Sequence, residues 1–106
     1  MTDNVMKEDK SRHIFEMQAD VGRTISNARR LMILDILQQG EMTVNQLADA
    51  LGMTQSSISQ HLSVLRQKGI LQSRRDGTVI FYRLTSIKVS QATGIMREVL
   101  TEMMSG

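Results

Sequence analysis

The sequence TQSSISQHLSVLRQKGI, residues 54–70, carries the pattern on which the fold of this chain depends. Thr54 is a suitable N-cap for a helix, and Gly69 is a suitable residue to end it. One narrow apolar stripe at i, i+4 and i+7 consists of Ile58, Leu62 and Leu65. Most other positions in the first half are serine or glutamine, although serine is only a middling helix former. Residues 54–68 are therefore predicted to form a helix whose first half, from Gln55 to His61, has an unusual polar face without formal charge if His61 is neutral.

A second short helix is predicted immediately before this one, in MTVNQLADALGMT. Thr43 and Gln46 have the spacing of a capping box, and Gly52 marks the end of the helix. The apolar face of this helix comprises Leu47, Ala48 and Leu51. Two short helices joined by a turn centred on glycine are typical of a helix-turn-helix, here residues 43–68.

The pattern changes to that of strands in ILQSRRDGTVIFYRL, residues 70–84. Asp76-Gly77 lies between two apolar runs, and this dipeptide is a strong hairpin signal. In the second run, Ile80, Tyr82 and Leu84 alternate with Val79, Phe81 and Arg83. A helix-turn-helix followed directly by a two-stranded wing predicts a winged helix.

Further helices are predicted on both sides of this unit. Residues 3–21 form a first helix that breaks at Gly22, residues 25–39 form a second, and residues 86–105 form the last. The predicted fold is a mainly α winged helix-turn-helix with a small β-hairpin, in the order α-α-α-α-β-β-α. The length of 106 residues suits a single winged-helix domain, residues 1–106.

The composition favours a polyanion as partner. The net charge is +2, but residues 54–83 contain five bases and one acid, while the rest of the chain is neutral or acidic. This concentration is typical of a nucleic-acid-binding surface, and a solvated basic face is the alternative. The chain has no cysteine, which excludes disulfides, thiolate metal sites and cysteine nucleophiles. Neither a membrane span nor a signal peptide is recognisable, so we expect a cytoplasmic protein without a membrane partner.

Residues 44–84 closely resemble the ArsR/SmtB family of dimeric bacterial and archaeal repressors. The resemblance rests on the Ser-x-His-Leu pattern that ends at Leu62, the Leu-Arg-x-x-Gly-Ile pattern that ends at Ile70, and the Arg-x-Gly wing with Tyr-x-Leu that ends at Leu84. The sequence NARRLMILDIL, residues 27–37, resembles the family's second helix, although Ala28 stands where members often have proline. The resemblance covers about half of the chain. It implies a homodimer built on the first and last helices, binding to an inverted-repeat operator, and repression relieved by a signal.

The same resemblance places residues 54–68 in the DNA major groove as the recognition helix. Its N-terminal turns should meet the base edges, where glutamine can bond adenine bidentately and serine can bond several bases. The predicted base-reading residues are Gln55, Ser56, Ser57, Ser59 and Gln60, of which Ser57 is the weakest candidate. The residues predicted to contact phosphates, from the helix or the wing, are His61, Ser63, Arg66, Lys68, Arg74, Arg75 and Thr78. A charged edge that prevents strand aggregation is the alternative role for the two wing arginines, and a buried structural role is the alternative for Arg30.

His61 has competing interpretations. The only other histidine is His13, so a metal site is not favoured. Ser57 and His61 lie one turn apart, but a serine–histidine pair without an acid and an oxyanion hole is a weak catalytic signal. No enzyme is therefore predicted. A structural hydrogen bond within the motif is the alternative to phosphate contact.

Apolar residues of the first and last helices are predicted to form the dimer interface. They are Ile14, Phe15, Met17, Ile87, Ile95, Met96, Val99 and Met103. The chain has nine methionines, which favour an adaptable hydrophobic seam over a ligand pocket or thioether metal site. His13, Glu16 and Asp20 have the spacing of a hard metal site but lack a partner on the last helix, so no metal or cofactor is predicted.

These features together predict a homodimeric, sequence-specific DNA-binding regulator that represses transcription at an inverted-repeat operator. The last helix lacks the cysteine, histidine and aspartate with which family members usually sense metals, arsenic or sulfur species, so no inducer is indicated. A winged-helix protein-interaction module without sequence-specific DNA reading is the alternative. The charge distribution favours the DNA-binding interpretation.

Overall fold

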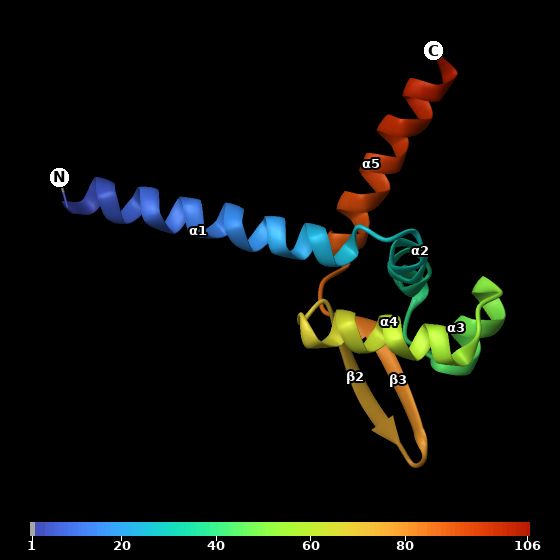
Figure 1. The fold of residues 1–106 in the computed structure, drawn as a ribbon. Helices are drawn as coiled ribbons and strands as arrows, with labels where there is room; N and C mark the ends of the chain where they lie inside the picture. The colour runs from blue at the N-terminus through green and yellow to red at the C-terminus, as the bar shows by residue number, and fades with distance from the viewer. Residues whose placement is uncertain (1) are drawn as a thin grey trace.

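The computed structural model describes the backbone of residues 2–106 and the side-chain environment of residues 8–106. Its elements are α1 (Thr2–Ile25), α2 (Ala28–Ile36), the 3-10 turn η1 (Leu37–Gln39), β1 (Met42–Thr43), α3 (Val44–Leu51), α4 (Gln55–Gln67), β2 (Leu71–Asp76), β3 (Val79–Leu84) and α5 (Ile87–Ser105). The predicted winged helix-turn-helix is confirmed. In Figure 1, α2, α3, α4 and the hairpin form one body, from which α1 and α5 extend in different directions.

The boundaries of the first two helices differ from the prediction. Helix α1 continues through Gly22 to Ile25, because one glycine costs a helix only about 1 kcal/mol. Helix α2 begins after Asn27, whose side-chain oxygen accepts hydrogen bonds from the backbone N–H groups of Arg29 and Arg30. The predicted helix over residues 25–39 was therefore wrong at both ends, since its last three residues form the 3-10 turn η1.

Local capping fixes the helix-turn-helix as the sequence predicts. Thr43 Oγ1 accepts from the backbone N–H of Gln46 at 3.1 Å, and Gln46 Oε1 accepts from the backbone N–H of Thr43 at 2.9 Å. Gly52 ends α3 in the left-handed conformation, with φ of 64°. Thr54 Oγ1 then accepts from the backbone N–H of Ser57 at 3.1 Å, which starts α4. Both helices thus have defined ends.

The wing belongs to a three-stranded antiparallel sheet in the order β1-β3-β2. Asp76 pairs with Val79, so the two loop residues are Gly77 and Thr78 rather than Asp76-Gly77. Gly77 has a φ of 65°, which suits the glycine-first type of tight hairpin. The sequence analysis did not predict β1, because two residues are too short to show alternation.

The hydrophobic core lies between α2, α3, α4 and the start of β2. Its buried apolar residues are Ile33, Leu34, Leu37, Leu47, Ala48, Ile58, Leu62, Leu65, Ile70 and Leu71. Among the residues with described side chains, α1 and α5 contribute no apolar residue to this buried set. Helix α5 is anchored differently, because the buried Ser90 hydroxyl donates to the carbonyl of Leu34 at 2.9 Å. The core therefore holds α4 firmly and leaves the two terminal helices largely uncovered.

Candidate nucleic-acid interface

Helix α4 presents two opposite faces. Ile58, Leu62 and Leu65 are completely buried, so the helical repeat turns the polar positions away from the core. The exposed positions include Gln55, Ser56, Ser59, Gln60, Ser63 and Arg66, whereas Ser57 and His61 are half-buried. In the described structure, none of the glutamine or serine side chains on the exposed face bonds to another protein group. Their donors and acceptors are therefore available to a ligand.

The two basic residues at the C-terminal end of α4 differ in their environments. Arg66 is exposed in the last turn and has no acidic partner in the described part of the chain. Lys68, the C-cap residue, instead lies 2.9 Å from Asp20 of α1. The hydrogen bond from Lys68 and its charge lower the pKa of the Asp20 carboxyl. Of these two predicted phosphate contacts, only Arg66 has an uncompensated charge.

His61 lies at the junction between helices. Arg30 Nε donates to His61 Nδ1 at 3.1 Å, and Arg30 Nη1 donates to the carbonyl oxygen of Thr24 at 2.8 Å. Burial, followed by the charges of Arg30 and Arg29, lowers the pKa of His61. The structural hydrogen bond considered for His61 therefore exists, but it comes from α2 and not from within the helix-turn-helix. Arg30 is half-buried and has the structural role considered for it.

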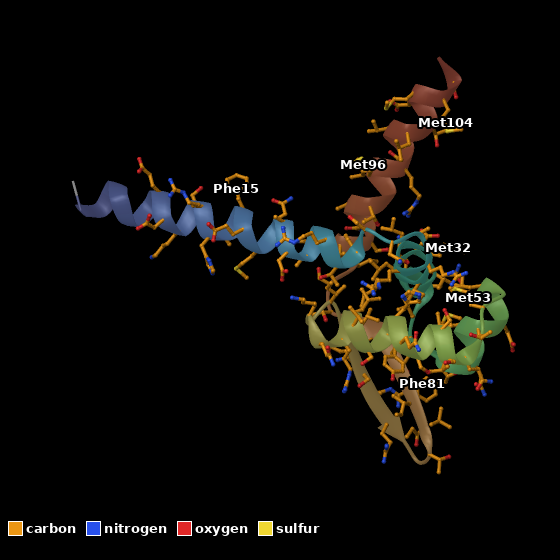
Figure 2. All side chains as sticks on the ribbon, in the orientation of Figure 1. Phe15, Met32, Met53, Phe81, Met96 and Met104 are labelled. Carbon is orange, nitrogen blue, oxygen red and sulfur yellow. The ribbon has the colours of Figure 1, made fainter. Side chains whose placement is uncertain are left out.

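The two wing arginines, predicted as a pair, point to opposite faces of the hairpin, as successive strand residues do. Arg74 donates from Nε and Nη2 to the carboxylate of Glu41, with Nε 2.9 Å from Oε2. Its guanidinium also lies 4.4 Å from the ring centre of Phe81, and Figure 2 shows Phe81 on the wing. The hydrogen bond from Arg74 lowers the pKa of Glu41. Arg75 is exposed and has no ion-pair partner among the described residues, and Thr78 is exposed at the tip.

The apolar residues predicted for the dimer interface are all exposed in the single chain. They are Ile14, Phe15, Met17, Ile87, Ile95, Met96, Val99 and Met103. The prediction omitted Leu100 and Met104, which are also exposed on α5. Figure 2 shows Phe15 on the projecting part of α1, and Met96 and Met104 along α5. An apolar groove of about 630 Å³ separates α1 from α5, and its lining includes Val21, Ile25, Leu31, Val89, Met96 and Leu100.

The described residues contain no group of three or more histidine, cysteine, aspartate or glutamate side chains placed to hold a metal ion. None of the described helices is both long and apolar enough to cross a membrane.

The stretch of chain that forms α2, α3, α4 and the start of β2 matches a known protein family. Residues 27–73 match the family described as "Bacterial regulatory protein, arsR family". The chain is also 39% identical, over 95 residues, to the biofilm growth-associated repressor of Xylella fastidiosa strain Temecula1, a match that covers 86% of this chain and 82% of that protein. The chain belongs to the ArsR family. It is thus a transcriptional regulator by family.

Two mycobacterial proteins extend the comparison. The HTH-type transcriptional regulator Rv0324 of Mycobacterium tuberculosis is 34% identical over 91% of this ArsR-family chain, which spans 42% of the length of Rv0324. The solution structure of Mb0332 from Mycobacterium bovis, described as a homodimeric winged helix-turn-helix DNA-binding domain, has a TM-score of 0.77 and 34% identity. That match covers 91% of this chain and 89% of the Mb0332 fragment. It extends the structural similarity into the terminal helices.

Three long-range side-chain pairs in this ArsR-family chain leave no signal in its sequence. Glu41 holds Arg74 across 33 residues, and Asp20 holds Lys68 across 48 residues. Arg30 and His61 are 31 residues apart. Each pair is brought together by packing of separate elements, so no local spacing signals it.

Proposed function

We propose that this chain is a homodimeric repressor that binds an inverted-repeat operator, with α4 of each copy in a major groove and the wing beside it. The observation that carries the proposal is the exposed face of α4. Its glutamines and serines have free donors and acceptors, and the opposite face is fixed in the core. Side chains of this kind discriminate bases by hydrogen-bond pattern rather than by charge.

The surrounding charges support the same interpretation. Arg66 at the end of α4 and Arg75 on the wing are exposed bases without acidic partners among the described residues. Both are suited to bind DNA phosphates. Phosphate contacts orient a protein on the duplex, while base contacts select the sequence. The division between Gln/Ser and Arg positions therefore matches the two tasks.

Dimerisation is supported by the uncovered terminal helices. Phe15 of α1 and Met103 of α5 are 67% and 71% exposed, and other exposed apolar side chains lie on the same two helices. Clusters of exposed apolar residues of this kind mark protein–protein interfaces. The groove between α1 and α5 offers a matching apolar surface for a second copy. The homodimeric description of the M. bovis structure and the repressor name of the X. fastidiosa relative agree with this assembly and role.

Replacement of Gln60 by alanine tests base reading. Footprinting of the purified protein on genomic DNA first identifies the operator, and fluorescence anisotropy then measures affinity for operator and for random DNA. We expect Gln60→Ala to weaken operator binding by about 1–3 kcal/mol and to relax its sequence preference. Gln67→Ala, an exposed glutamine at the other end of α4, serves as control and should change specificity little.

The outcomes separate the proposal from the alternative function. Equal losses on operator and random DNA would contradict base reading by Gln60. No preference of the wild-type protein for any genomic site would favour a protein-interaction module. Repression itself is tested with a reporter placed behind the operator, whose expression should rise when the regulator gene is deleted.

A further inference from the structure

Arg30 joins the end of α1 to the middle of the recognition helix. One guanidinium donates to the carbonyl of Thr24, in the last turn of α1, and to the imidazole of His61 in α4. The last four carbonyls of a helix have no intrahelical partner, so the bond to Thr24 satisfies a group that would otherwise be free. Positive charge is also favourable at this end of the helix dipole. A single planar guanidinium thus contacts both helices from α2.

We propose that Arg30 is the positioning residue that sets the orientation of α4 relative to α1, and that it thereby determines which half-site spacing the dimer accepts. This inference rests on the proposed function, in which α1 contributes to the dimer interface and α4 reads the half-site. Arg30 itself need not touch DNA.

The geometry requires a guanidinium at this position. Its N–H groups lie in one plane at fixed angles, so the two bonds transmit the direction of α1 to α4. A lysine ammonium sits on a flexible stem and has no such fork. The backbone of Arg30 is itself held, because its N–H donates to the Asn27 side chain at 3.2 Å. The connection is therefore anchored at the corner between α1 and α2.

His61 can accept this bond in only one form. An arginine N–H is always a donor, so Nδ1 of His61 must carry the lone pair and the imidazole proton must be on Nε2. The lowered pKa of His61 agrees with a neutral imidazole beside two arginines. The tautomer is measurable in the absence of DNA, which gives the inference an independent test.

A second contact between the same two helices acts in the same direction. Asp20 of α1 pairs with Lys68 at the C-cap of α4, with 2.9 Å between Oδ2 and Nζ. Both groups are substantially exposed, so this pair contributes little on its own. Together with the bond to His61, it contacts α4 at two separated points. Two points define the direction of a helix, whereas one leaves it free to pivot.

Half-site spacing is the property that this arrangement should control. Adding one base pair between half-sites rotates them by about 34° around the duplex axis. A dimer with a rigid connection between α1 and α4 cannot follow this rotation, whereas a loosened one can. Loss of Arg30 should therefore broaden the accepted spacing without changing the preferred bases within each half-site.

The experiment compares full-length wild type, Arg30→Lys and Arg30→Met on operators whose central spacer is shortened or lengthened by one base pair. Wild type should bind the altered spacers at least about tenfold more weakly than the native one, a ratio within the usual range of coupling between sites. In both variants this ratio should fall below about threefold. Arg29→Met is the matched control, because Arg29 is exposed on the same helix. It removes the same charge and should retain the wild-type ratio.

Two further measurements keep the inference falsifiable if an Arg30 variant does not fold. His61→Met removes the same bond from its other end and should broaden spacing equally. In nitrogen-15 NMR spectra of the wild-type protein without DNA, His61 should carry its proton on Nε2, and a proton on Nδ1 would overturn the inference outright. Spacing selectivity that survives in folded Arg30→Met would also overturn it. If wild type shows no spacing preference while the His61 tautomer is as expected, it is the proposed inverted-repeat function that fails, and the spacing role fails with it.

Discussion

At the scale of single residues, the role of each basic side chain depends more on its neighbours than on whether it is lysine, arginine or histidine. Lys68 and Arg74 are paired with carboxylates, whereas Arg66 and Arg75 are exposed without such partners in the described structure. His61 lies against Arg30, and both side chains are half-buried. Although Arg66, Lys68, Arg74 and Arg75 all lie within the basic residues 54–83, only Arg66 and Arg75 have a charge free for phosphate. His61 also has a protonation state on which local structure depends.

Stability should depend on pH through His61. Burial and the charges of Arg30 and Arg29 lower its pKa below the ordinary value of 6.5. Between the lowered pKa of the folded state and the ordinary value of 6.5, the folded state therefore binds fewer protons than the unfolded state. In that pH range the free energy of unfolding rises with pH. The contribution is complete above about pH 6.5 and is lost as the pH falls through that value toward the lower pKa of the folded state.

Thermal unfolding from about pH 8 to about pH 5 measures this effect, since the window contains the histidine transition. The comparison is with His61→Gln, whose side-chain oxygen can still accept from Arg30 but does not titrate. Wild type should lose stability more steeply than the variant on acidification. Parallel curves for the two proteins would show that the pKa of His61 is the same in the folded and the unfolded state.

At the scale of elements, the wing is held to the body of the molecule by its own arginine. Arg74 contacts Phe81 in β3 and also Glu41, which immediately precedes β1. Strand β1 pairs with β3 through Met42 and Tyr82. The guanidinium thus ties β2 to the start of β1 across the sheet. Arg75, on the other face, is free of this task and is the wing residue best suited to bind DNA.

Neighbouring arginines should therefore differ in their contribution to salt dependence. Arg75→Ala should weaken binding to operator and random DNA alike and reduce the salt slope by about 1, because one phosphate contact is lost. Arg74→Ala should change the slope less, since its charge is compensated by Glu41. Anisotropy titrations over a series of salt concentrations measure both slopes. A slope unchanged by Arg75→Ala would rule out its phosphate contact.

At the scale of the whole molecule, the apolar surface is unevenly distributed. The core is complete between α2, α3, α4 and β2, whereas α1 and α5, which extend away from it (Figure 1), carry exposed apolar residues. Met104 of α5 is exposed at 88% and Phe15 of α1 at 67%. Burial of one such side chain contributes about 1.5–3 kcal/mol, so several together supply a strong force for association. A second copy offers the same surfaces in return.

Sedimentation should show a dimer near the working concentration of the wild-type protein, and Phe15→Glu should shift it toward monomer. The introduced carboxylate would have to be buried without a partner in the interface, which is costly. As the dimer is lost, operator affinity should fall too, because in the proposed complex each monomer contacts only one half-site. Val79→Glu is the control, since Val79 is an exposed apolar residue on the wing, and it should leave the sedimentation unchanged. If the wild-type protein sediments as a monomer and still binds the operator with full affinity, the proposed homodimer is contradicted.

Local patterns in the sequence determined most of the fold. The capping box at Thr43, the N-cap Thr54 and the left-handed Gly52 act within a few residues, so their spacing predicts the helix-turn-helix directly. The apolar stripe of α4 likewise determines which side chains face outward. Local rules were insufficient at Gly22, where the continuing helix outweighed the penalty of one glycine, and at β1, which exists only by pairing with β3.

Only the tertiary structure decided how the charged and titratable groups are used. It assigned Arg74 to Glu41, Lys68 to Asp20, and Arg30 to both Thr24 and His61. These partners are far apart in the sequence, and their distances depend on how separate helices and strands pack. A residue's type and spacing determine what it can bind. Which partner it meets depends on the packed core, because hydrogen bonds and ion pairs act over a few ångströms in space.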